Sequence, residues 1–285
     1  MNLPYLSEER IHAFIVNALN EDIGNGDHSS LGSISENQIS NAQLIIKGEG
    51  ILAGMDLARK IFLHIDPHFE LDILLKDGDK VKFGEIGFHI HGKSRAILAG
   101  ERLALNCLQR MSGIATYTHQ LSDMIRGTGA KLLDTRKTTP NFRLAEKWAV
   151  AIGGGVNHRF GLYDMVMLKD NHIDYAGGVR QAIESSVAYL KEKKIDLKIE
   201  VEVRNLRELQ EVIDTGGVFR VLLDNMLPSS IRQAIGLVDG KMETEASGGI
   251  TENNIREIAE TGVNYISVGA LTHSYKSIDI SLKAE

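Results

Sequence analysis

From residue 131 onward the sequence alternates between short apolar runs and amphipathic segments, and this alternation constrains the fold more than any other feature. Six runs have the length of a strand: KLLDTR, YDMVMLKD, LKIEVEV, VFRVLLDN, METEASGG and YISVGA. Their ends are roughly 22–35 residues apart, the length of a βα unit. Repeated βα units build a parallel sheet, either an incomplete barrel, because a complete one needs eight strands, or a doubly wound sheet. No G-x-G-x-x-G motif follows the first run, which weakens a dinucleotide-binding interpretation.

The first part of the chain has a different pattern. Ser7 can cap a helix whose apolar residues recur at helical spacing, and another helix is expected over residues 57–65. Between residues 42 and 98, short β-like runs are separated by Gly and Asp-Gly turns, which predicts a mostly antiparallel sheet. The polar segment 21–33 is expected to form turns. A long helix that begins at Gly100 leads into the βα region. We therefore predict a small α+β domain ahead of that region.

Composition excludes several classes of protein. The net charge of −6 argues against nucleic acid binding, because nucleic-acid-binding domains are basic. No window reaches about 18 uninterrupted apolar residues, so no membrane span is expected, and the first residues lack the pattern of a secretory signal. The single cysteine, Cys107, excludes an internal disulfide and fits a reducing compartment. Its apolar helical surroundings indicate a buried structural thiol. We expect a cytoplasmic protein.

In this acidic chain, residues 134–172 concentrate positive charge. The basic side chains and histidines of the segment are Arg136, Lys137, Arg143, Lys147, His158, Arg159, Lys169 and His172. Arginine binds carboxylates and phosphates through two points and lysine offers a mobile charge, so the segment predicts a site for a strongly anionic small molecule. The strand-end pair Arg136–Lys137 and the pair His158–Arg159 are the better candidates. Arg143 and Lys147 lie four residues apart on a predicted helix and could simply face solvent.

Carboxylates stand at two of the predicted strand ends. In IEVEV, Glu200 and Glu202 share one strand face, opposite the aliphatic residues. If the aliphatic face packs against helices, both carboxylates point inward, where a carboxylate without a partner is costly. Glu202 lies nearer the carboxyl end of its strand, and Asp224 ends the next strand in the same way. Such a pair suits Mg²⁺ or ribose hydroxyls. The alternative is that these groups neutralise nearby cations, and Glu200 is expected to be a structural charge.

Glycine-rich turns end the last two predicted strands. Ser247, Gly248 and Gly249 precede a predicted helix start at Thr251, where free N–H groups and the helix dipole favour an anion. Gly269, about 22 residues later, follows the next strand and allows close approach of the backbone. One such turn is ordinary. The pair predicts a phosphate site, which recurs at the last strands of α/β barrels.

The motifs of this chain resemble those of the quinolinate phosphoribosyltransferase family, also called nicotinate-nucleotide pyrophosphorylase (carboxylating). The matching stretches, in family order, are EDIGNGD, GEGILAG, GERLALNCLQRMSGIAT, DTRKTTP, EKWAVAIGGGVNHRFGLYDMVMLKDNHI, EVEV, LLDNM, EASGGI and ISVGALTHS. The resemblance implies a type II phosphoribosyltransferase fold. Its parts would be an N-terminal α/β sandwich over residues 1–112, on which residues 275–285 pack back, and an incomplete α/β barrel of six or seven strands over residues 113–274. PNFR (140–143) and DHSS (27–30) depart from the family pattern.

The resemblance also implies an enzyme of NAD biosynthesis. Phosphoribosyl would pass from phosphoribosyl pyrophosphate to quinolinate, giving nicotinate mononucleotide, diphosphate and CO₂. The residues that would meet the two carboxylates of quinolinate are Arg136, His158, Arg159 and Lys169. Lys137 would lie close to the diphosphate. Because such a reaction needs mainly positioning and charge stabilisation, it requires no nucleophilic side chain.

The remaining implied roles concern the metal, the phosphate and the oligomer. Glu202 and Asp224 would hold ribose hydroxyls and Mg²⁺, directly or through the substrate. The implied 5-phosphate site is Ser247, Gly248, Gly249 and Gly269, with His273 nearby. The implied catalytic set is Lys137, Lys169, Glu202 and Asp224. The family forms homodimers with shared sites, so Arg102 would reach the substrate of the partner subunit.

Other functions remain open at this stage. A paralogous group linked to molybdenum transport shares DTRKT-like and HR-like motifs, and a nicotinate phosphoribosyltransferase would act without decarboxylation. From a different class, Lys169 at a strand end could be the Schiff-base lysine of an aldolase, although the phosphate turns and paired carboxylates would then be unexplained. A non-catalytic nucleotide-binding regulator would leave the charged strand ends without a purpose.

Overall fold

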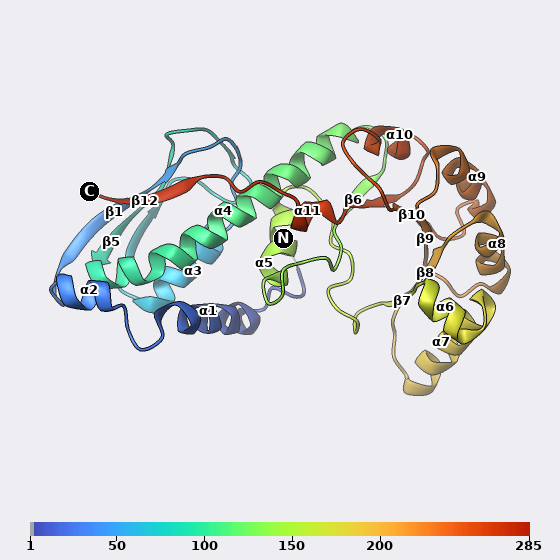
Figure 1. Cartoon of the computed structure of the whole chain (residues 1–285), viewed down its shortest axis with the longest axis horizontal. Helices are drawn as coiled ribbons and strands as arrows, with labels where there is room; N and C mark the ends of the chain where they lie inside the picture. The colour runs from blue at the N-terminus through green and yellow to red at the C-terminus, as the bar shows by residue number, and fades with distance from the viewer. Residues whose placement is uncertain (1–2) are drawn as a thin grey trace. The chain divides into compact units, whose positions relative to one another are not determined.

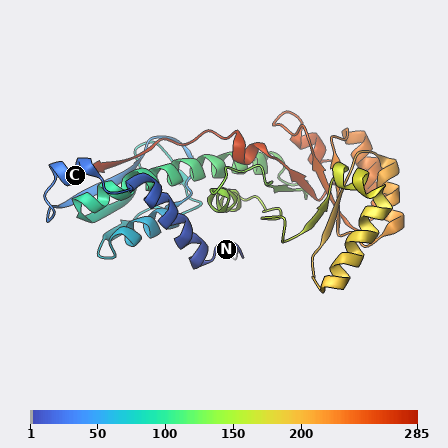
Figure 2. The same cartoon turned by 60° about the horizontal axis from the view of Figure 1, so that its bottom comes forward.

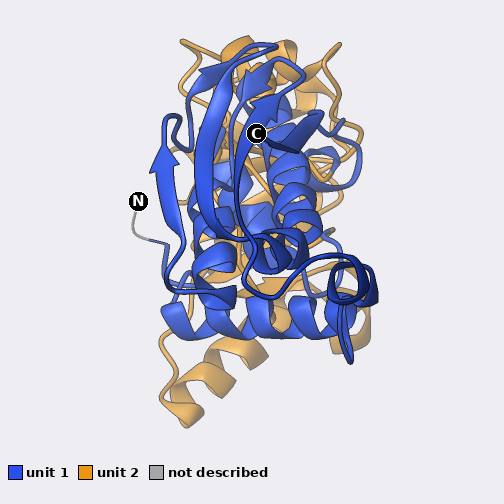
Figure 3. Ribbon diagram, turned by 90° about the vertical axis from the view of Figure 1, so that its left-hand side faces the viewer, with its two compact units in different colours: residues 1–119, 138–154, 270–285 blue, residues 120–137, 155–269 orange. Residues whose placement is uncertain are grey.

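The computed structural model describes residues 3–285, which form two compact units (Figure 3). The first unit comprises the chain up to residue 119 together with residues 138–154 and 270–285, and the second comprises residues 120–137 and 155–269. The expected boundary at 112/113 falls inside helix α4, which runs without a break over Ser94–Met124. Among the described residues, no helix is long and apolar enough to cross a membrane.

The first unit contains the antiparallel sheet that the early β-like runs predicted. Its strands follow the order β12-β1-β5-β3, with bounds Ile280–Ala284, Ile39–Ile46, Ile86–Lys93 and Glu70–Ile73. A separate pair joins β2 (Gly50–Ile51) to β4 (Lys80–Val81). Strand β12 pairs with β1, so the C-terminal segment returns to the N-terminal sheet (Figure 1). Edge-to-face rings in the core, Phe62 against Phe69 and Phe88, pack beneath this sheet.

The first unit contains the helices predicted after Ser7, over residues 57–65, from Gly100 and around Arg143, together with two that were not predicted, α2 and α11. In chain order they are α1 (Glu8–Ile23), α2 (His28–Ser33), α3 (Met55–Ile65), the first part of α4, α5 (Arg143–Ile152) and α11 (Ala270–His273). Ser7 caps α1, since its side chain accepts the N–H of Arg10. The expectation of turns over residues 21–33 is wrong for α2. Asp27 caps this short helix by accepting the N–H of Ser30, a local signal that outweighs the polar composition.

The second unit is the parallel α/β layer that the alternating pattern predicted. The sheet order is β6-β11-β10-β9-β8-β7, and its strands are Lys131–Leu133, Tyr265–Ser267, Glu243–Ser247, Arg220–Asp224, Ile199–Val203 and Val166–Leu168. Every pairing is parallel, and each strand lies within one of the six predicted runs. Within residues 3–285, no pairing joins β7 to β6, so the sheet stays open. The expected α/β fold with an incomplete barrel is confirmed.

Helices cover one face of this sheet. They are α6 (Asp170–Ala176), α7 (Val179–Lys193), α8 (Leu206–Thr215), α9 (Pro228–Val238) and α10 (Ile255–Ala259). Figure 2 shows α7, α8 and α9 side by side along the strands. Asn205 caps α8 by accepting the N–H groups of Arg207 and Glu208, and Gly216 ends it, as predicted. The expectation that a helix starts at Thr251 is wrong, because α10 begins at Ile255, one turn later.

Candidate active site

The carboxyl ends of the six parallel strands meet at one edge of the second unit, because all strands of a parallel sheet point the same way. Along this edge the sheet order brings the predicted residues together in sequence: Arg136 and Lys137 after β6, Gly269 after β11, Ser247 at the end of β10, Asp224 at the end of β9, Glu202 in β8 and Lys169 after β7. Ser247 and Asp224 are direct register partners. Cationic, acidic and glycine-rich groups therefore share one edge.

Lys169, Glu202 and Asp224 form the charged part of this edge. Lys169 caps α6, and its Nζ lies 3.6 Å from Oε2 of Glu202. Burial raises the pKa of Glu202, Lys169 opposes this rise, and Asp224 and Asp170 add to it. The side chain of Glu202 is mostly buried, at 14% exposure, and that of Lys169 is half-exposed, so both have some access to a ligand at the strand ends. Paired carboxylate oxygens of this kind are hard donors for a cation or for hydroxyl groups.

Two guanidinium groups of this unit lie near each other. The pKa of Arg159 is lowered, chiefly by burial and next by the positive charge of Arg136. Arg159 donates from Nη1 to the carbonyl oxygen of Met165 at 3.1 Å, which orients the guanidinium. Two half-buried arginines repel each other unless an anion lies between or beside them. The pair is compatible with the anion site that the basic segment predicts, and that site stays a prediction.

His158 lies inside the unit rather than at its surface. Its side chain is only 6% exposed, and its Nδ1 accepts the backbone N–H of Arg159 at 2.7 Å. The backbone N–H of His158 donates to Oδ1 of Asp134 at 2.8 Å, and Oδ2 of Asp134 accepts Nδ2 of Asn157 at 2.7 Å. Asp134 is fully buried at the end of β6. In this conformation His158 faces the protein interior, and its predicted contact with a substrate carboxylate stays a prediction.

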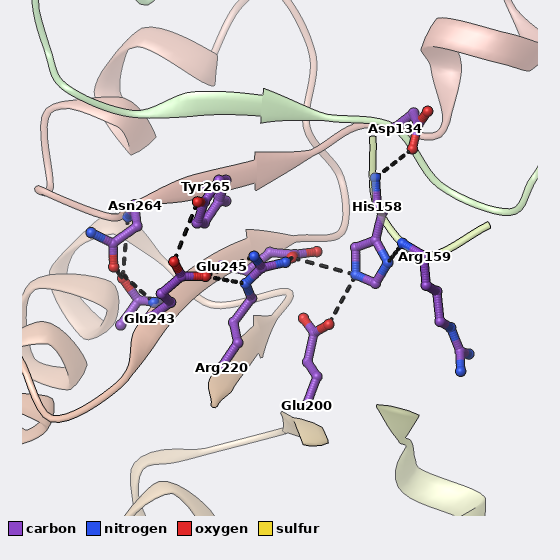
Figure 4. A network of polar contacts seen from close by, with 10 residues as sticks. Asp134, His158, Arg159, Glu200, Arg220, Glu243, Glu245, Asn264 and Tyr265 are labelled. Atoms are coloured by element: carbon purple, nitrogen blue, oxygen red, sulfur yellow. Dashed lines mark hydrogen bonds and ion pairs between the residues drawn. The ribbon is translucent and has the colours of Figure 1, made fainter. Parts of the chain in front are cut away.

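Beneath the strand ends, the ring of His158 faces two buried carboxylates (Figure 4). Its Nε2 lies 2.9 Å from Oε2 of Glu200 and 3.6 Å from Oε2 of Glu245. Burial raises the pKa of Glu200 to about 7, while Arg220 lowers it. Burial and the charge of Glu200 likewise raise the pKa of Glu245 to about 7. Glu200 therefore has the structural position that its place in the strand predicted.

Arg220 links this cluster to the exposed end of β10. Its Nη1 donates to Glu245 at 3.2 Å, and its Nη2 donates to Glu243 at 2.7 Å. Burial opposes the charge of Arg220, but the hydrogen bonds with Glu243 and the charges of Glu200 and Glu245 raise its pKa overall. The guanidinium also stacks over the ring of Tyr265, 4.2 Å from its centroid. One cation is thus shared among three carboxylates.

The turn after β10 is built by glycine. Gly248 has φ +88°, and a Cβ at this position would lie 2.3 Å from Oδ1 of Asn225. Asn225 in turn donates its backbone N–H to the carbonyl of Ser247 at 2.8 Å, and its Nδ2 donates to Asp224 at 2.8 Å. Only a residue without a side chain fits this turn. The turn therefore packs closely against Asn225, next to Asp224, and its predicted role as a phosphate site stays a prediction.

The segment between Gly249 and α10 is organised by Asn254. Its Oδ1 accepts the N–H of Thr251 at 2.8 Å, and its Nδ2 donates to the carbonyl of Gly249 at 2.9 Å. Because α10 has only five residues and begins at Ile255, the predicted contribution of a helix dipole at Thr251 is not available. An anion at this turn would therefore depend on the backbone N–H groups of Ser247–Gly249 alone.

Other predicted residues belong to the first unit. Arg102 is exposed on α4, and His273 is exposed at the end of α11, where its Nδ1 contacts Oγ of Ser274 at 2.8 Å. The suggestion that Lys147 is solvated is wrong, because its side chain is fully buried in α5. Arg143 lies partly buried at the start of the same helix, where its Nε donates to Oγ1 of Thr138.

Two members of the polar network escaped the sequence analysis. Glu245 is fully buried in β10, and Arg220 is buried in β9. The signal for Glu245 was present, because Glu243 and Glu245 alternate with small or apolar residues just as Glu200 and Glu202 do in β8. Arg220 gave no such signal, since one basic residue in an apolar strand is not distinguishable from an edge residue. The cross-strand register Glu200↔Arg220 appears only in the fold.

Comparison with known proteins agrees with this arrangement. Residues 27–112 match the family "Quinolinate phosphoribosyl transferase, N-terminal domain" and residues 114–283 its C-terminal domain. The chain is 44% identical to "Quinolinate phosphoribosyltransferase [decarboxylating] 2b, mitochondrial" of Nicotiana tabacum, over 94% of this chain and 80% of the relative. It is 43% identical to "Probable nicotinate-nucleotide pyrophosphorylase [carboxylating]" of Bacillus subtilis, over 92% of this chain and 89% of the relative.

Solved structures give the same result. The crystal structure of NadC from Streptococcus pyogenes superposes with a TM-score of 0.91 at 39% identity, and it covers 98% of this chain and 97% of its own. Human nicotinic acid phosphoribosyltransferase superposes with a TM-score of 0.60 at 12% identity, which shows a shared fold alone. The two family domains together match nearly the whole chain, and the relatives are more than 40% identical over nearly all of it. The protein belongs to the quinolinate phosphoribosyltransferase family, whose members are enzymes.

Proposed function

We propose that this enzyme transfers phosphoribosyl from phosphoribosyl pyrophosphate to quinolinate and releases diphosphate and CO₂, forming nicotinate mononucleotide for NAD synthesis. The single observation that carries this proposal is that the partly buried guanidinium groups of Arg136 and Arg159 lie near enough for the charge of one to lower the pKa of the other. Quinolinate offers two adjacent carboxylates, which fit such a group of cations. The names of the relatives support the same substrate.

In the proposed reaction the protein orients two anions against each other. The turn Ser247–Gly249 would take the 5-phosphate through backbone N–H groups, and Glu202 and Asp224 would accept the ribose hydroxyls. Lys137, exposed after β6, would meet the diphosphate. The C1–O bond to diphosphate breaks while the pyridine nitrogen bonds to C1. The ring nitrogen is then cationic, so the C2–carboxylate bond can break with its electron pair left on C2, which takes up a proton.

The carboxylates at this edge fit a divalent cation. Asp224 raises the pKa of Glu202, which means that the two negative charges are near enough to repel each other. Glu202 and Asp224 would hold Mg²⁺ directly or through the ribose and diphosphate oxygens. When bound, the ion would stabilise the negative charge that develops on the leaving diphosphate. Loss of activity on chelation, with recovery on added Mg²⁺, is the expected observation.

A homodimer completes the proposal. Arg102 is exposed on α4 in the first unit, so its guanidinium is accessible to a second chain. We propose that it reaches the substrate of a partner subunit.

The location proposed is the cytoplasm, supported by the single thiol of Cys107, whose pKa burial raises to about 12 and which is therefore unreactive. Cell fractionation would check the location.

The decisive experiment measures CO₂ and nucleotide together. Purified protein is given Mg²⁺, phosphoribosyl pyrophosphate and quinolinate carrying a labelled 2-carboxylate. Equal amounts of labelled CO₂ and nicotinate mononucleotide are expected. If nicotinate reacts equally well and no CO₂ is released, the protein is instead a nicotinate phosphoribosyltransferase and the proposal is wrong.

A further inference from the structure

A cluster of three buried side chains lies beneath the proposed site, and its two carboxylates have no role in the transfer chemistry proposed above. The cluster consists of His158, Glu200 and Glu245, whose candidate ligand atoms all lie within 4.8 Å of one another. Glu200 and Glu245 are fully buried, and the side chain of His158 is 6% exposed. Two buried carboxylates around one ring cost folding free energy unless they serve a purpose or are well compensated.

The hydrogen bonds of His158 fix where its proton lies. Nδ1 accepts the backbone N–H of Arg159 at 2.7 Å, so this nitrogen carries no proton. The proton of the neutral ring is therefore on Nε2. That nitrogen lies 2.9 Å from Oε2 of Glu200 and 3.6 Å from Oε2 of Glu245. Nε2 makes no hydrogen bond to either carboxylate, so the contact is an electrostatic one between the N–H dipole and the carboxylates rather than an ion pair.

The same hydrogen bond argues against a metal ion in the cluster. A neutral histidine that binds a metal through Nε2 carries its proton on Nδ1 and donates it to an acceptor. In this protein Nδ1 meets a donor instead. A metal at Nε2 would require the ring to lose both protons or the Arg159 N–H to turn away. The cluster is therefore built to hold an imidazole in one orientation.

We propose that Glu200 and Glu245 are positioning residues that, through His158, set the place of the Arg159 guanidinium that receives a carboxylate of quinolinate. This inference rests on the proposed function. Glu200 and Glu245 lie against Nε2 without hydrogen-bonding it, so they restrict the ring by close contact and charge, and the ring accepts the Arg159 backbone N–H through Nδ1. In Figure 4 the side chain of Arg159 extends from this point away from the ring. The far end is held by the carbonyl of Met165, so the guanidinium is located at both ends.

The surroundings hold the cluster itself in place. Asp134 accepts the backbone N–H of His158 from the side of β6. Arg220 from β9 reaches Glu245, and Glu243 from β10 holds Arg220 in turn. The approach of each carboxylate to the ring is thus set by a neighbouring strand. A displaced acceptor would shift the ring and then Arg159, and misplacing a binding group by about 1 Å can cost about a hundredfold in rate.

Two variants of Glu200 separate position from charge. Glu200→Asp keeps the charge but draws the acceptor back by one methylene, and we expect the KM for quinolinate to rise about tenfold or more. The KM for phosphoribosyl pyrophosphate should change less than about twofold, because the phosphate turn is not involved. Glu200→Gln is neutral but keeps an acceptor at the same reach, and it should recover most of the quinolinate affinity. Glu211→Gln, in the same unit but paired with Arg207 on α8 rather than with any member of this network, is the control and should behave as wild type.

The outcome is contrary to the proposal if Glu200→Asp leaves the quinolinate KM unchanged, if both KM values rise equally, or if Glu200→Gln is as impaired as Glu200→Asp. The Asp and Gln variants both keep a polar group at position 200, and their folding is checked by thermal unfolding. A double variant Glu200→Asp/His158→Asn should be no worse for quinolinate than His158→Asn alone, since both changes act along one path. Additive losses would contradict that path.

A second measurement does not depend on activity, so it separates this inference from the proposed reaction. Nitrogen-15 spectra of His158 in the full-length protein should show the neutral ring with its proton on Nε2 in wild type and Glu200→Gln. The Nδ1-protonated ring in wild type would overturn the inference. Addition of Zn²⁺ alone tests the metal alternative. Unchanged His158 signals are expected, and a stoichiometric shift that Glu245→Gln abolishes would assign the cluster to a metal instead.

Discussion

Nζ of Lys169 lies 3.6 Å from Oε2 of Glu202, across the ends of the neighbouring strands β7 and β8. This contact joins the two halves of the proposed site, because Lys169 belongs to the cationic part and Glu202 to the part that would hold ribose. Lysine here also lowers the pKa of Glu202 against the effect of burial. One side chain therefore has two roles, to neutralise a carboxylate and to attract an anion.

The first prediction concerns this lysine. Lys169→Met removes a cation from beside the proposed carboxylate site, and the KM for quinolinate should rise by a factor of about ten to a hundred, since charge-assisted contacts contribute roughly 1.5–3 kcal/mol. Steady-state kinetics with each substrate varied would measure it. Lys193→Met is the matched control, because this lysine is half-exposed as well but pairs with Glu192 on α7. Equal effects of the two substitutions would contradict a local role for Lys169.

The second prediction concerns the phosphate turn. Gly248→Ala places a methyl group 2.3 Å from Oδ1 of Asn225 at a backbone φ of +88°. The KM for phosphoribosyl pyrophosphate should rise at least about tenfold, and the positive φ should cost about 1–3 kcal/mol of stability. Gly240→Ala is the control for the backbone cost alone, because Gly240 has φ +70° and open space around it.

A second substitution distinguishes the clash from the conformational cost. Asn225→Gly removes the side chain that the new methyl group would meet, and Asn225 itself has φ +53°, which glycine tolerates. The double variant Gly248→Ala/Asn225→Gly should therefore bind phosphoribosyl pyrophosphate better than Gly248→Ala alone. If the double variant is no better, the turn is not limited by this contact.

The third prediction concerns stability and pH. Burial raises the pKa of Glu245 to about 7, above the value of 4.5 that an exposed glutamate has. Below pH 4.5 the proton is bound in both states and the contribution to stability is fully present. Between 4.5 and about 7 the unfolded chain releases the proton first, so this contribution is lost as pH rises. The raised pKa of Glu200 acts in the same direction.

Thermal unfolding between pH 5 and 8 would measure this loss. Glu245→Gln cannot ionise, so its Tm should fall less over that interval than the Tm of wild type, by several degrees at roughly 2–4 °C per kcal/mol. Asp27 and Asp66 have lowered pKa values and act at more acidic pH, outside this interval. Glu211→Gln, on α8 and paired with Arg207, should keep the wild-type profile. An identical slope in wild type and Glu245→Gln would contradict the assignment.

A helix or strand could be predicted from the sequence where a local pattern, such as an apolar run between turn residues or a capping residue, was enough to identify it. The strands of the second unit were found because each is a short apolar run between turn residues, and all six lie where those runs are. Local capping was read correctly at Ser7 and Asn205. It was missed at Asp27, because a short helix within a polar segment has no apolar face to reveal it.

The site could be predicted only as far as the strand ends. Parallel strands bring their carboxyl ends to one edge, so residues as distant as Arg136 and Asp224 were correctly expected on the same edge. Side-chain direction within the unit was beyond the sequence. Nothing in HRF shows that His158 turns inward to Glu200, and helical spacing alone made Lys147 look solvated although its side chain is fully buried.

The fourth prediction tests whether the proposed site is shared between subunits. Arg102→Ala and Lys169→Ala should each abolish most activity, because each removes one cation from every site of a homodimer. After subunits of the two variants are mixed and exchanged, a heterodimer would contain one site that carries both defects and one that carries neither. A random mixture is half heterodimer, so the recovered activity should approach a quarter of the wild-type rate.

Subunit exchange is verified by mass spectrometry on differently tagged chains, and a mixture of Lys169→Ala with itself is the control. Full exchange without any recovery would place Arg102 and Lys169 in the same subunit's site, and the shared site would be wrong.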